Sequence, residues 1–212
     1  MISENNKNPE LKIPPFHPKM LENEPQNTGS EDVSTGSFIM EIIKFTIISI
    51  LIVAPIRLFI AQPFIVRGES MDPTYSDGQY LIVDELTYRK EQPERGDVIV
   101  FKYPKDPSKY FIKRIIGLPN EKVSVSNGII TITGAAYPSG KVLNEPYIKE
   151  LSYDNFTETL GENEYFVMGD NRSNSLDSRM WGPLHKKNII GRVFVRLFPL
   201  QTAGLFPGKQ NE

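Results

Sequence analysis

The feature that most constrains this chain is one long apolar run at residues 38–66, FIMEIIKFTIISILIVAPIRLFIAQPFIV. A helix over residues 38–61 would span roughly 36 Å, which is enough to cross a bilayer. Large apolar side chains would face every side of this helix, which favours a membrane anchor over a buried helix of a soluble core. Glu41, Lys44 and Arg57 interrupt the run and are expected near the membrane interfaces. We therefore predict a transmembrane anchor at residues 38–61.

The segment before this run has a different composition. Residues 1–37 contain five prolines and carry a net charge of −3, with few large apolar side chains. Little apolar surface is available there to offset the entropy lost by an ordered chain, so we predict a disordered N-terminal tail. Because this tail precedes the run and no small-residue cleavage site follows it, we expect an anchor and not a cleaved leader. Basic residues are equally frequent near both ends of the run, so the positive-inside rule assigns no orientation.

From about Gln62 the pattern changes to short strands separated by turns, which is typical of a β-rich domain. Asn127-Gly128 is a strong signal for a two-residue hairpin. No helix longer than two turns is evident after residue 66. We predict a β domain at residues 62–200, followed by a polar C-terminal tail at residues 201–212. The hairpin would place Val125 opposite Ile130 and Val123 opposite Ile132; the strand candidates are Tyr80–Val83, Asp97–Phe101, Tyr110–Ile116, Val123–Ser126, Ile129–Thr133, Tyr165–Met168 and Gly191–Leu197.

Composition excludes several kinds of site. The chain has no cysteine, which rules out disulfides, cysteine nucleophiles and cysteine metal ligands. It has only two histidines, His17 and His185, so a three-histidine zinc site is impossible. The formal net charge is −2, and this lack of basic excess argues against nucleic-acid binding.

Two segments carry residues suited to nucleophilic catalysis. Ser70 lies directly after the apolar run, between Gly68 and Pro73, where a turn would present its hydroxyl outward. Most serines in such turns are structural, so this signal is weak alone. Lys113 and Arg114 lie in an apolar strand and point to opposite faces. Burial would lower the pKa of such a lysine, and a neutral amine beside a serine hydroxyl can act as its general base. The alternative is an edge strand whose charges are solvated.

A third segment, residues 169–182, is rich in acids, arginines, asparagines and serines and contains the only tryptophan, Trp181. Asp–Arg pairs and Asx turns would make such a loop rigid. A Ser-His-Asp triad is the competing arrangement, but His17 falls in the predicted tail. His185 stands beside Lys186 and Lys187, as expected for a solvated loop. A histidine-based mechanism is therefore disfavoured.

Taken together, these segments resemble the bacterial type I signal peptidases, serine peptidases of family S26 with a Ser/Lys dyad. The resemblance covers roughly residues 38–200. Its specific motifs are Ser70-Met71-x-Pro73-Thr74 behind an anchor, Lys113-Arg114-Ile115-Ile116-Gly117-Leu118-Pro119, and the run from Gly169 to Gly182. The implied fold is a mainly β catalytic core of coiled antiparallel sheets, behind one N-terminal transmembrane helix and against the membrane surface.

The resemblance also implies roles for individual residues. Ser70 would be the nucleophile and Lys113 the general base, while Ser175 would orient the lysine by a hydrogen bond. Two ion pairs would give structural support: Asp177 with Arg179, and Arg114 with Asp170. Gly68 departs from the family pattern, because some members carry there a hydroxyl that completes the oxyanion hole. That hole would here rely on backbone N–H groups, including that of Ser70.

Apolar residues near the dyad suggest where a substrate would lie. Phe64 and Val66 come before Ser70, and Phe111 and Ile112 come before Lys113. Both segments are strand-like, so an extended peptide could pair with them while shallow pockets accept alternate side chains. We place Tyr75 in the same substrate-binding set; it stands where the family commonly has a leucine.

The function predicted from this resemblance is cleavage of N-terminal signal peptides from secreted preproteins. The partners would be preproteins with small residues before the cut and the lipid bilayer, with no metal, cofactor or nucleic acid. The protein would be a single-pass monomer of the bacterial plasma membrane, with its catalytic domain on the extracytoplasmic side. Two alternatives remain: a self-cleaving Ser/Lys regulator, which should carry a DNA-binding region, and a non-enzymatic membrane-tethered β domain.

Overall fold

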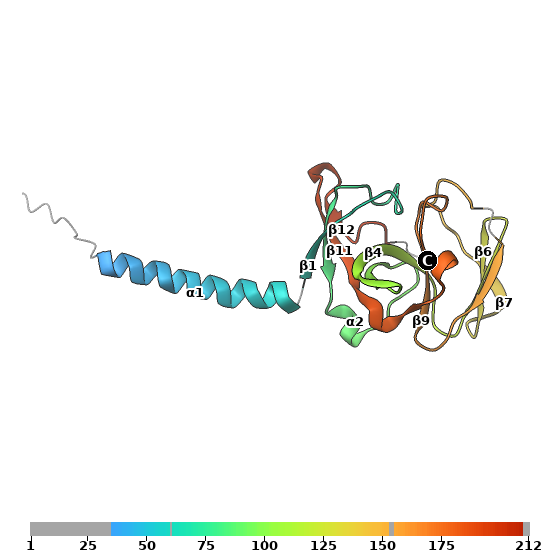
Figure 1. Ribbon diagram of the computed structural model, residues 1–212, viewed down its shortest axis with the longest axis horizontal. Helices are drawn as coiled ribbons and strands as arrows, with labels where there is room; N and C mark the ends of the chain where they lie inside the picture. The colour runs from blue at the N-terminus through green and yellow to red at the C-terminus, as the bar shows by residue number, and fades with distance from the viewer. Residues whose placement is uncertain (1–34, 60, 153–154, 210–212) are drawn as a thin grey trace, which may run out of the picture. The chain divides into compact units, whose positions relative to one another are not determined.

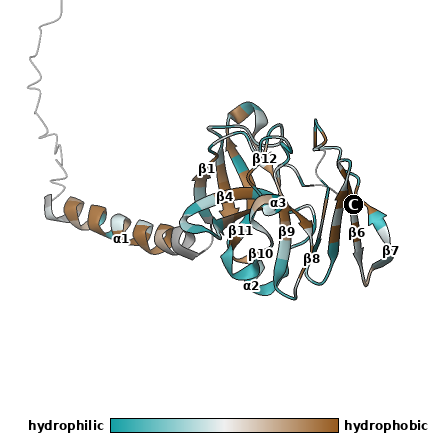
Figure 2. Ribbon diagram, turned by 45° about the vertical axis from the view of Figure 1, so that its right-hand side comes forward, coloured by the Kyte–Doolittle hydropathy of each residue, from teal (hydrophilic) through white to brown (hydrophobic). Residues whose placement is uncertain are grey.

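The computed structural model describes residues 35–59, 61–152 and 155–209. Helix α1 (Thr35–Phe59) covers most of the predicted anchor, and apolar residues follow one another along it (Figure 2). Only the last three residues of the predicted disordered tail are described, and they belong to α1. In the described part of the chain, none of the helices combines the length and apolarity needed to span a membrane. The transmembrane anchor remains a prediction.

The β domain contains a larger antiparallel sheet with the strand order β1-β2-β11-β3-β4-β9-β10, in which β12 also pairs with β11. Strand β1 contains Pro63 and lies at an edge of this sheet, the position at which a sheet tolerates proline. The strands are β1 (Ala61–Ile65), β2 (Tyr80–Asp84), β3 (Val98–Tyr103), β4 (Asp106–Gly117), β9 (Glu164–Met168), β10 (Leu184–His185), β11 (Ile189–Phe198) and β12 (Gly204–Leu205).

A smaller antiparallel sheet has the order β7-β6-β5-β8. Figure 1 shows β6 and β7 on one side of β9, with β1, β11 and β12 on the other side. Strands β5 and β6 form the hairpin predicted at Asn127-Gly128, and both turn residues have positive φ (50° and 79°). Its predicted register is confirmed: Val123 pairs with Ile132 and Val125 pairs with Ile130. The strands are β5 (Lys122–Ser126), β6 (Ile129–Gly134), β7 (Tyr137–Val142) and β8 (Phe156–Thr159).

In the part of the β domain that the structure describes, helical structure is limited to single turns, as the sequence predicts. Four strands were not predicted from the sequence, and a fifth, β1, was anticipated only as a strand-like segment around Phe64. Strands β7 and β8 are short and half exposed, and neither shows clear alternation of polar and apolar residues. Strand β7 also contains a proline and Gly140, which has φ +86°. Strands β10 and β12 have only two residues each and are equally inconspicuous in the sequence. The helical turns are α2 (Thr87–Lys90), α3 (Ser178–Trp181), η1 (Lys186–Asn188) and η2 (Leu200–Thr202).

The residues after Leu200 pack against the β domain. Gly204 and Leu205 pair with β11, and the carbonyl of Pro207 accepts a hydrogen bond from the Tyr75 hydroxyl. The carbonyl of Gly208 accepts a hydrogen bond from Arg114 Nη1 at 2.6 Å. Contacts with the β domain therefore extend to residue 208, beyond the domain boundary that we predicted at residue 200.

Candidate active site

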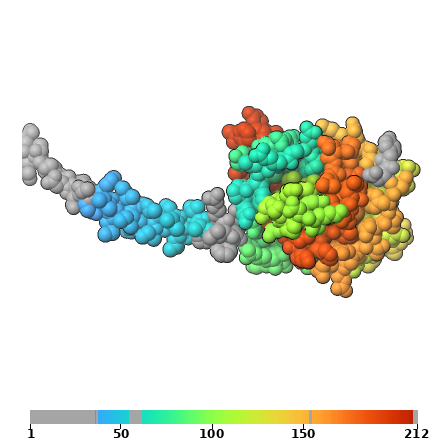
Figure 3. All heavy atoms as spheres, viewed as in Figure 1, coloured from blue at the N-terminus to red at the C-terminus, as the bar shows by residue number. Residues whose placement is uncertain are grey.

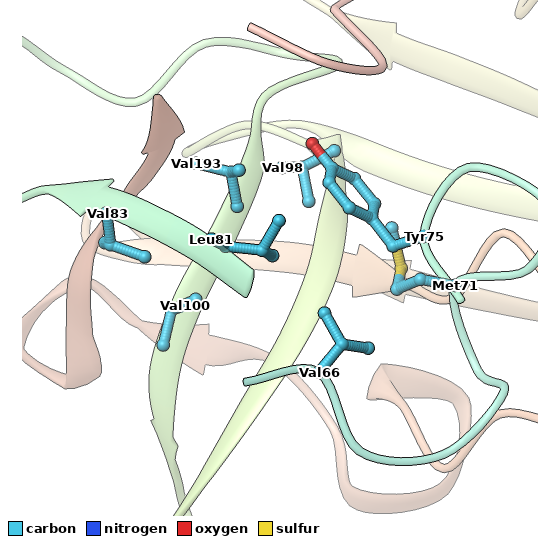
Figure 4. Packing of buried hydrophobic residues seen from close by; sticks show 8 residues of the cluster. All are labelled: Val66, Met71, Tyr75, Leu81, Val83, Val98, Val100 and Val193. Carbon is cyan, nitrogen blue, oxygen red and sulfur yellow. The ribbon is translucent and has the colours of Figure 1, made fainter. Parts of the chain in front are cut away.

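Ser70 lies in a turn that follows β1, and two buried side chains come shortly after it. Met71 and Tyr75 are 1% and 0% exposed. They lie in an apolar cluster with Val66 and Val98 (Figure 4). The backbone N–H of Tyr75 donates to the carbonyl of Met71 at 2.9 Å, which closes the turn. The turn is thus anchored on one side by buried side chains, while Ser70 itself is half-buried.

Lys113 reaches Ser70 from the middle of β4. Its Nζ lies 2.7 Å from Ser70 Oγ and donates a second hydrogen bond to the carbonyl of Ile112 at 2.9 Å. The residue is 3% exposed. Burial lowers the pKa of Lys113 to about 8, although the negative charges of Asp177 and Asp170 act in the opposite direction. A substantial fraction of the lysine can therefore be the neutral amine near neutral pH.

A cavity of about 770 Å³ opens beside this pair and is lined mainly by apolar side chains. Phe64 from β1 contacts Tyr110 from β4, with ring centroids 5.6 Å apart, so these two strands face each other at the cavity. On the face shown in Figure 3, the yellow-green surface of the β3–β4 hairpin borders the teal residues after β1 and the orange loop after β9. Four residues of the predicted substrate-binding set line the cavity: Phe64, Val66, Phe111 and Ile112.

Tyr75 is the exception, and its predicted role requires correction. Its side chain is completely buried in the cluster with Met71 and is absent from the cavity wall (Figure 4). Its hydroxyl donates to the carbonyl of Pro207. Because the residue faces the core and the C-terminal segment, it supports the Ser70 turn and has no surface for a substrate.

The loop after β9 is held by Asp177 and Arg179. Arg179 Nε donates to Asp177 Oδ1 at 2.8 Å, and Nη2 donates to Oδ2 at 2.9 Å. Asp177 Oδ2 also accepts from the backbone N–H of Gly169 at 3.1 Å. Burial alone would raise the pKa of the Asp177 carboxyl, but the hydrogen bonds and positive charge of Arg179 hold it below its usual value. The carboxylate therefore stays ionised beside the lysine.

Arg114 and Asp170 form a second bidentate pair. Arg114 Nε and Nη2 donate to the two Asp170 oxygens at 2.8 and 2.7 Å, and both side chains are buried. Arg114 Nη1 donates to the carbonyl of Gly96 at 2.9 Å, which joins the loop before β3 to this pair. Burial works against the guanidinium charge, yet Asp170 keeps the pKa of Arg114 above its ordinary value.

Ser175 lies near the dyad but makes a different set of contacts from the one that we predicted. Lys113 Nζ donates to Ser70 and Ile112 within the described structure, and not to Ser175. Ser175 Oγ is buried and has no hydrogen-bond partner of standard geometry. It lies close enough to the Asp177 carboxylate to help lower the pKa of that group. The lysine-orienting role of Ser175 remains a prediction.

Sequence reasoning assigned no role to several residues that build the site. A side chain at Gly169 would place its Cβ 2.3 Å from both Ser175 Oγ and the Ser70 carbonyl, so only glycine fits there. Arg172 is buried and pairs with Glu145, 27 residues away. No local pattern signals these contacts, because each joins segments that are distant along the chain.

His185 lies away from this arrangement. His185 ends β10, its side chain is 55% exposed, and its Nε2 is 3.5 Å from Glu164 Oε1. His185 does not line the cavity beside Ser70. His17 lies outside the described residues. The described residues contain no group of three or more His, Cys, Asp or Glu side chains arranged to hold a metal ion.

Comparison with known proteins identifies the family. The family described as signal peptidase, peptidase S26, matches residues 39–198 of this chain. The chain belongs to this family. It is therefore a peptidase, a hydrolase that acts on peptide bonds.

Similar proteins agree with this assignment. A probable signal peptidase I-2 from Synechocystis is 36% identical over 88% of this chain and 81% of its own length. A signal peptidase I from Leptolyngbya laminosa is 36% identical over 85% of this chain and 90% of its own length. Signal peptidase I S from Bacillus subtilis is 35% identical over 80% of this chain and 95% of its own length. The matches cover between 81% and 95% of the length of these relatives.

Proposed function

We propose that this S26 peptidase is a membrane-bound serine endopeptidase that removes signal peptides from secreted preproteins. Ser70 is its nucleophile and Lys113 its general base. The observation that carries the proposal is the 2.7 Å contact between Ser70 Oγ and Lys113 Nζ at the wall of an apolar cavity. The names of the relatives, all signal peptidases I, support the substrate class.

The chemistry follows from the protonation state of Lys113. With a pKa of about 8, roughly a tenth of the molecules would hold the neutral amine at pH 7. That amine takes the hydroxyl proton while Ser70 Oγ forms a bond to the scissile carbonyl carbon. The resulting ammonium returns the proton to the leaving amine as the C–N bond breaks. Water, deprotonated by the same amine, then hydrolyses the ester and releases the cleaved chain from Ser70.

The shape of the cavity supports an extended substrate with small side chains before the cut. Phe64 and Tyr110 bring β1 and β4 close together, and the outer edge of β1 is unpaired within the described sheet. A peptide strand could therefore be bound by main-chain hydrogen bonds. Phe111 and Ile112 leave apolar space beside the dyad. We propose that this space accepts small residues at the first and third positions before the cut.

Exposed apolar side chains support attachment to a membrane. In α1, Phe45 and Leu51 are 68% and 71% exposed. In the β domain, Phe198 pairs with Tyr80, and Tyr80 pairs with Ile65, so one end of the larger sheet gathers exposed apolar residues. The full set there is Ile65, Tyr80, Leu197, Phe198, Leu200 and Leu205. We propose that α1 anchors the protein in the bacterial plasma membrane and that this end of the larger sheet contacts lipid on the extracytoplasmic side.

The test is cleavage by the purified full chain in detergent. Two substrates are compared: a preprotein with an Ala-x-Ala site, and the same preprotein with Phe in place of the last Ala. We expect a single cut after the second Ala of the first substrate and none in the second. Absence of cleavage, or equal cleavage of both, would refute the proposal. Cleavage of the enzyme's own chain alone would favour the self-cleaving regulator.

A further inference from the structure

The connection between β7 and β8 joins two strands of the smaller sheet and, along its course, contacts the segments that hold the dyad. Four of its side chains each contact a charged residue of those segments. Glu145 binds Arg172, the Tyr147 ring lies over Arg114, Lys149 approaches Asp72, and Ser152 accepts from Arg179. None of these four residues has a role in the mechanism proposed above.

Glu145 makes a buried contact. Its two carboxylate oxygens accept hydrogen bonds from Nη1 and Nη2 of Arg172, at 3.1 Å for Nη1. The side chains of Arg172 and Glu145 are only 2% and 6% exposed. Removing one member of a buried charge pair leaves the other uncompensated, which strongly favours rearrangement of the surrounding chain. The position of Arg172 therefore depends on Glu145.

Arg172 closes a ring of hydrogen bonds around Gly169. Its Nε donates to the carbonyl of Gly169 at 3.2 Å, and its own carbonyl accepts from Arg179 Nη2 at 2.7 Å. Arg179 binds Asp177, and Asp177 accepts from the Gly169 N–H. The ring ends where it began, so movement of Arg172 affects both polar groups of the Gly169 backbone.

This ring is joined directly to the nucleophile. The backbone N–H of Asn171 donates to the carbonyl of Ser70 at 3.1 Å. Gly169 lies so close to that carbonyl that a Cβ would come within 2.3 Å of it. The loop between Gly169 and Arg172 thus forms one wall against which Ser70 rests.

Glu145 also reaches the second ion pair. Its Oε1 accepts a hydrogen bond from the Tyr147 hydroxyl at 2.7 Å, and the Tyr147 ring centroid lies 4.0 Å from the Arg114 guanidinium carbon. Arg114 follows Lys113 in β4 and binds Asp170. One carboxylate from the β7–β8 connection is therefore linked to both the Ser70 side and the Lys113 side of the dyad.

We propose that Glu145 is a positioning residue for the peptidase reaction. It fixes Arg172 and Tyr147, and through them it keeps Ser70 and Lys113 in contact and Lys113 free of water. The proposal rests on the dyad assigned above. A merely structural ion pair would stabilise the fold without affecting the reactivity of Lys113.

The experiment compares Glu145→Gln with Glu162→Gln in the full-length protein. Glu162 is exposed in the turn between β8 and β9, so its variant makes the same chemical change at a solvated position. For each protein, kcat, KM, the pH dependence of kcat/KM and the melting temperature are measured. For Glu145→Gln we expect kcat to fall about tenfold or more while KM changes less than about twofold. In the pH profile, the rise of kcat/KM with pH is assigned to Lys113 and is called the lysine limb. Its apparent pKa should increase by about half a unit or more, because a loosened loop between Gly169 and Arg172 admits water to Lys113. Glu162→Gln should match the wild type.

A double variant separates positioning from stability. Glu145→Leu combined with Arg172→Leu removes both buried charges, so its melting temperature should recover relative to Glu145→Leu alone. Its kcat should stay low, because the hydrogen bond from Arg172 Nε to Gly169 is lost. Recovery of kcat and of the wild-type pH limb together with stability would overturn the proposal. An unchanged kcat and pH limb in Glu145→Gln would do the same.

Two further measurements keep the test decisive. If Glu145→Gln does not fold, Tyr147→Phe removes only one hydroxyl and should shift the same pH limb in the same direction; an unshifted limb contradicts the proposal. The pKa of Lys113 can also be measured without a substrate, from the ¹³Cε chemical shift in lysine-labelled protein, assigned with Lys113→Arg. Failure of the wild type to cleave preproteins would reject the proposed function, whereas an unshifted Lys113 pKa in the variants would reject only the role of Glu145.

Discussion

The two sheets of the β domain share antiparallel pairing but differ in what they bury. The core of the smaller sheet is apolar, with Val123, Val125, Ile130 and Ile132 at its centre. In the described residues, no strand of this sheet buries a charged side chain. The larger sheet buries Lys113 and Arg114 in one strand, and the loop after β9 buries three more charged residues: Asp170, Arg172 and Asp177.

This difference indicates that the smaller sheet contributes mainly stability, whereas the larger sheet carries the reactive groups. Apolar burial stabilises the smaller sheet without any specific partner. The buried charges of the larger sheet each need a precisely placed partner, because a buried ion without one is strongly destabilising. Lys113 is the member of this group whose charge is least compensated, and the pKa that results is the one that the proposed reaction needs. Four predictions test this division.

The largest effect is expected at the dyad. Ser70→Ala removes the proposed nucleophile and Lys113→Ala the proposed base, so each should lower kcat/KM by more than about 10³-fold. Both proteins should stay folded, because neither substitution leaves a buried charge without its partner. The measurements are cleavage of the Ala-x-Ala preprotein and circular dichroism. Substantial cleavage by either folded variant would remove that residue from the mechanism.

Next in size is Arg179→Ala, which would leave Asp177 buried and without its charged partner. We expect the free energy of unfolding to fall by about 3–5 kcal/mol and activity to fall with it. Urea titration followed by tryptophan fluorescence and turnover per folded molecule measure the two losses. A variant that unfolds like the wild type yet is inactive would instead give Arg179 a direct part in the chemistry.

A smaller change is expected from pH alone. Because the pKa of Lys113 is lowered to about 8, the neutral amine increases roughly tenfold between pH 7 and pH 9, and kcat/KM should rise with it. If the group had to be protonated to act, kcat/KM would instead fall as the pH rises. His185→Ala is the control, since this exposed side chain lies outside the cavity. Loss of the acid limb in that variant, with the fold intact, would make the histidine the base.

The smallest effect on activity is expected in the smaller sheet. Ile132→Ala removes a fully buried side chain opposite Val123 and should lower the free energy of unfolding by about 2–5 kcal/mol. Turnover per folded molecule should stay within about twofold of the wild type, because no charged contact changes. A large loss of turnover would show that apolar packing in this sheet also acts on the dyad, and the contrast between the sheets would fail.

Sequence patterns were sufficient where short-range periodicity controls structure. The β5–β6 hairpin follows from Asn127-Gly128 and the alternation on both sides of it, since turn geometry and side-chain alternation together determine the register. The candidates Ser70 and Lys113 came from motifs that resemble a known family. Placing Tyr75 in the substrate site was wrong, because its burial depends in part on Val193 and Pro207, which lie far from it in sequence.

By itself, the sequence determined the mainly β class, one long apolar helix, the central strands and the family. The tertiary structure alone decided that Ser70 Oγ lies 2.7 Å from Lys113 Nζ and that burial lowers the pKa of that lysine. It alone decided that Glu145, in the connection between β7 and β8, pairs with Arg172. The physical reason is that a pKa and a buried ion pair depend on which segments exclude water from a group, and segments separated by 27 to 43 residues meet only when the chain is folded.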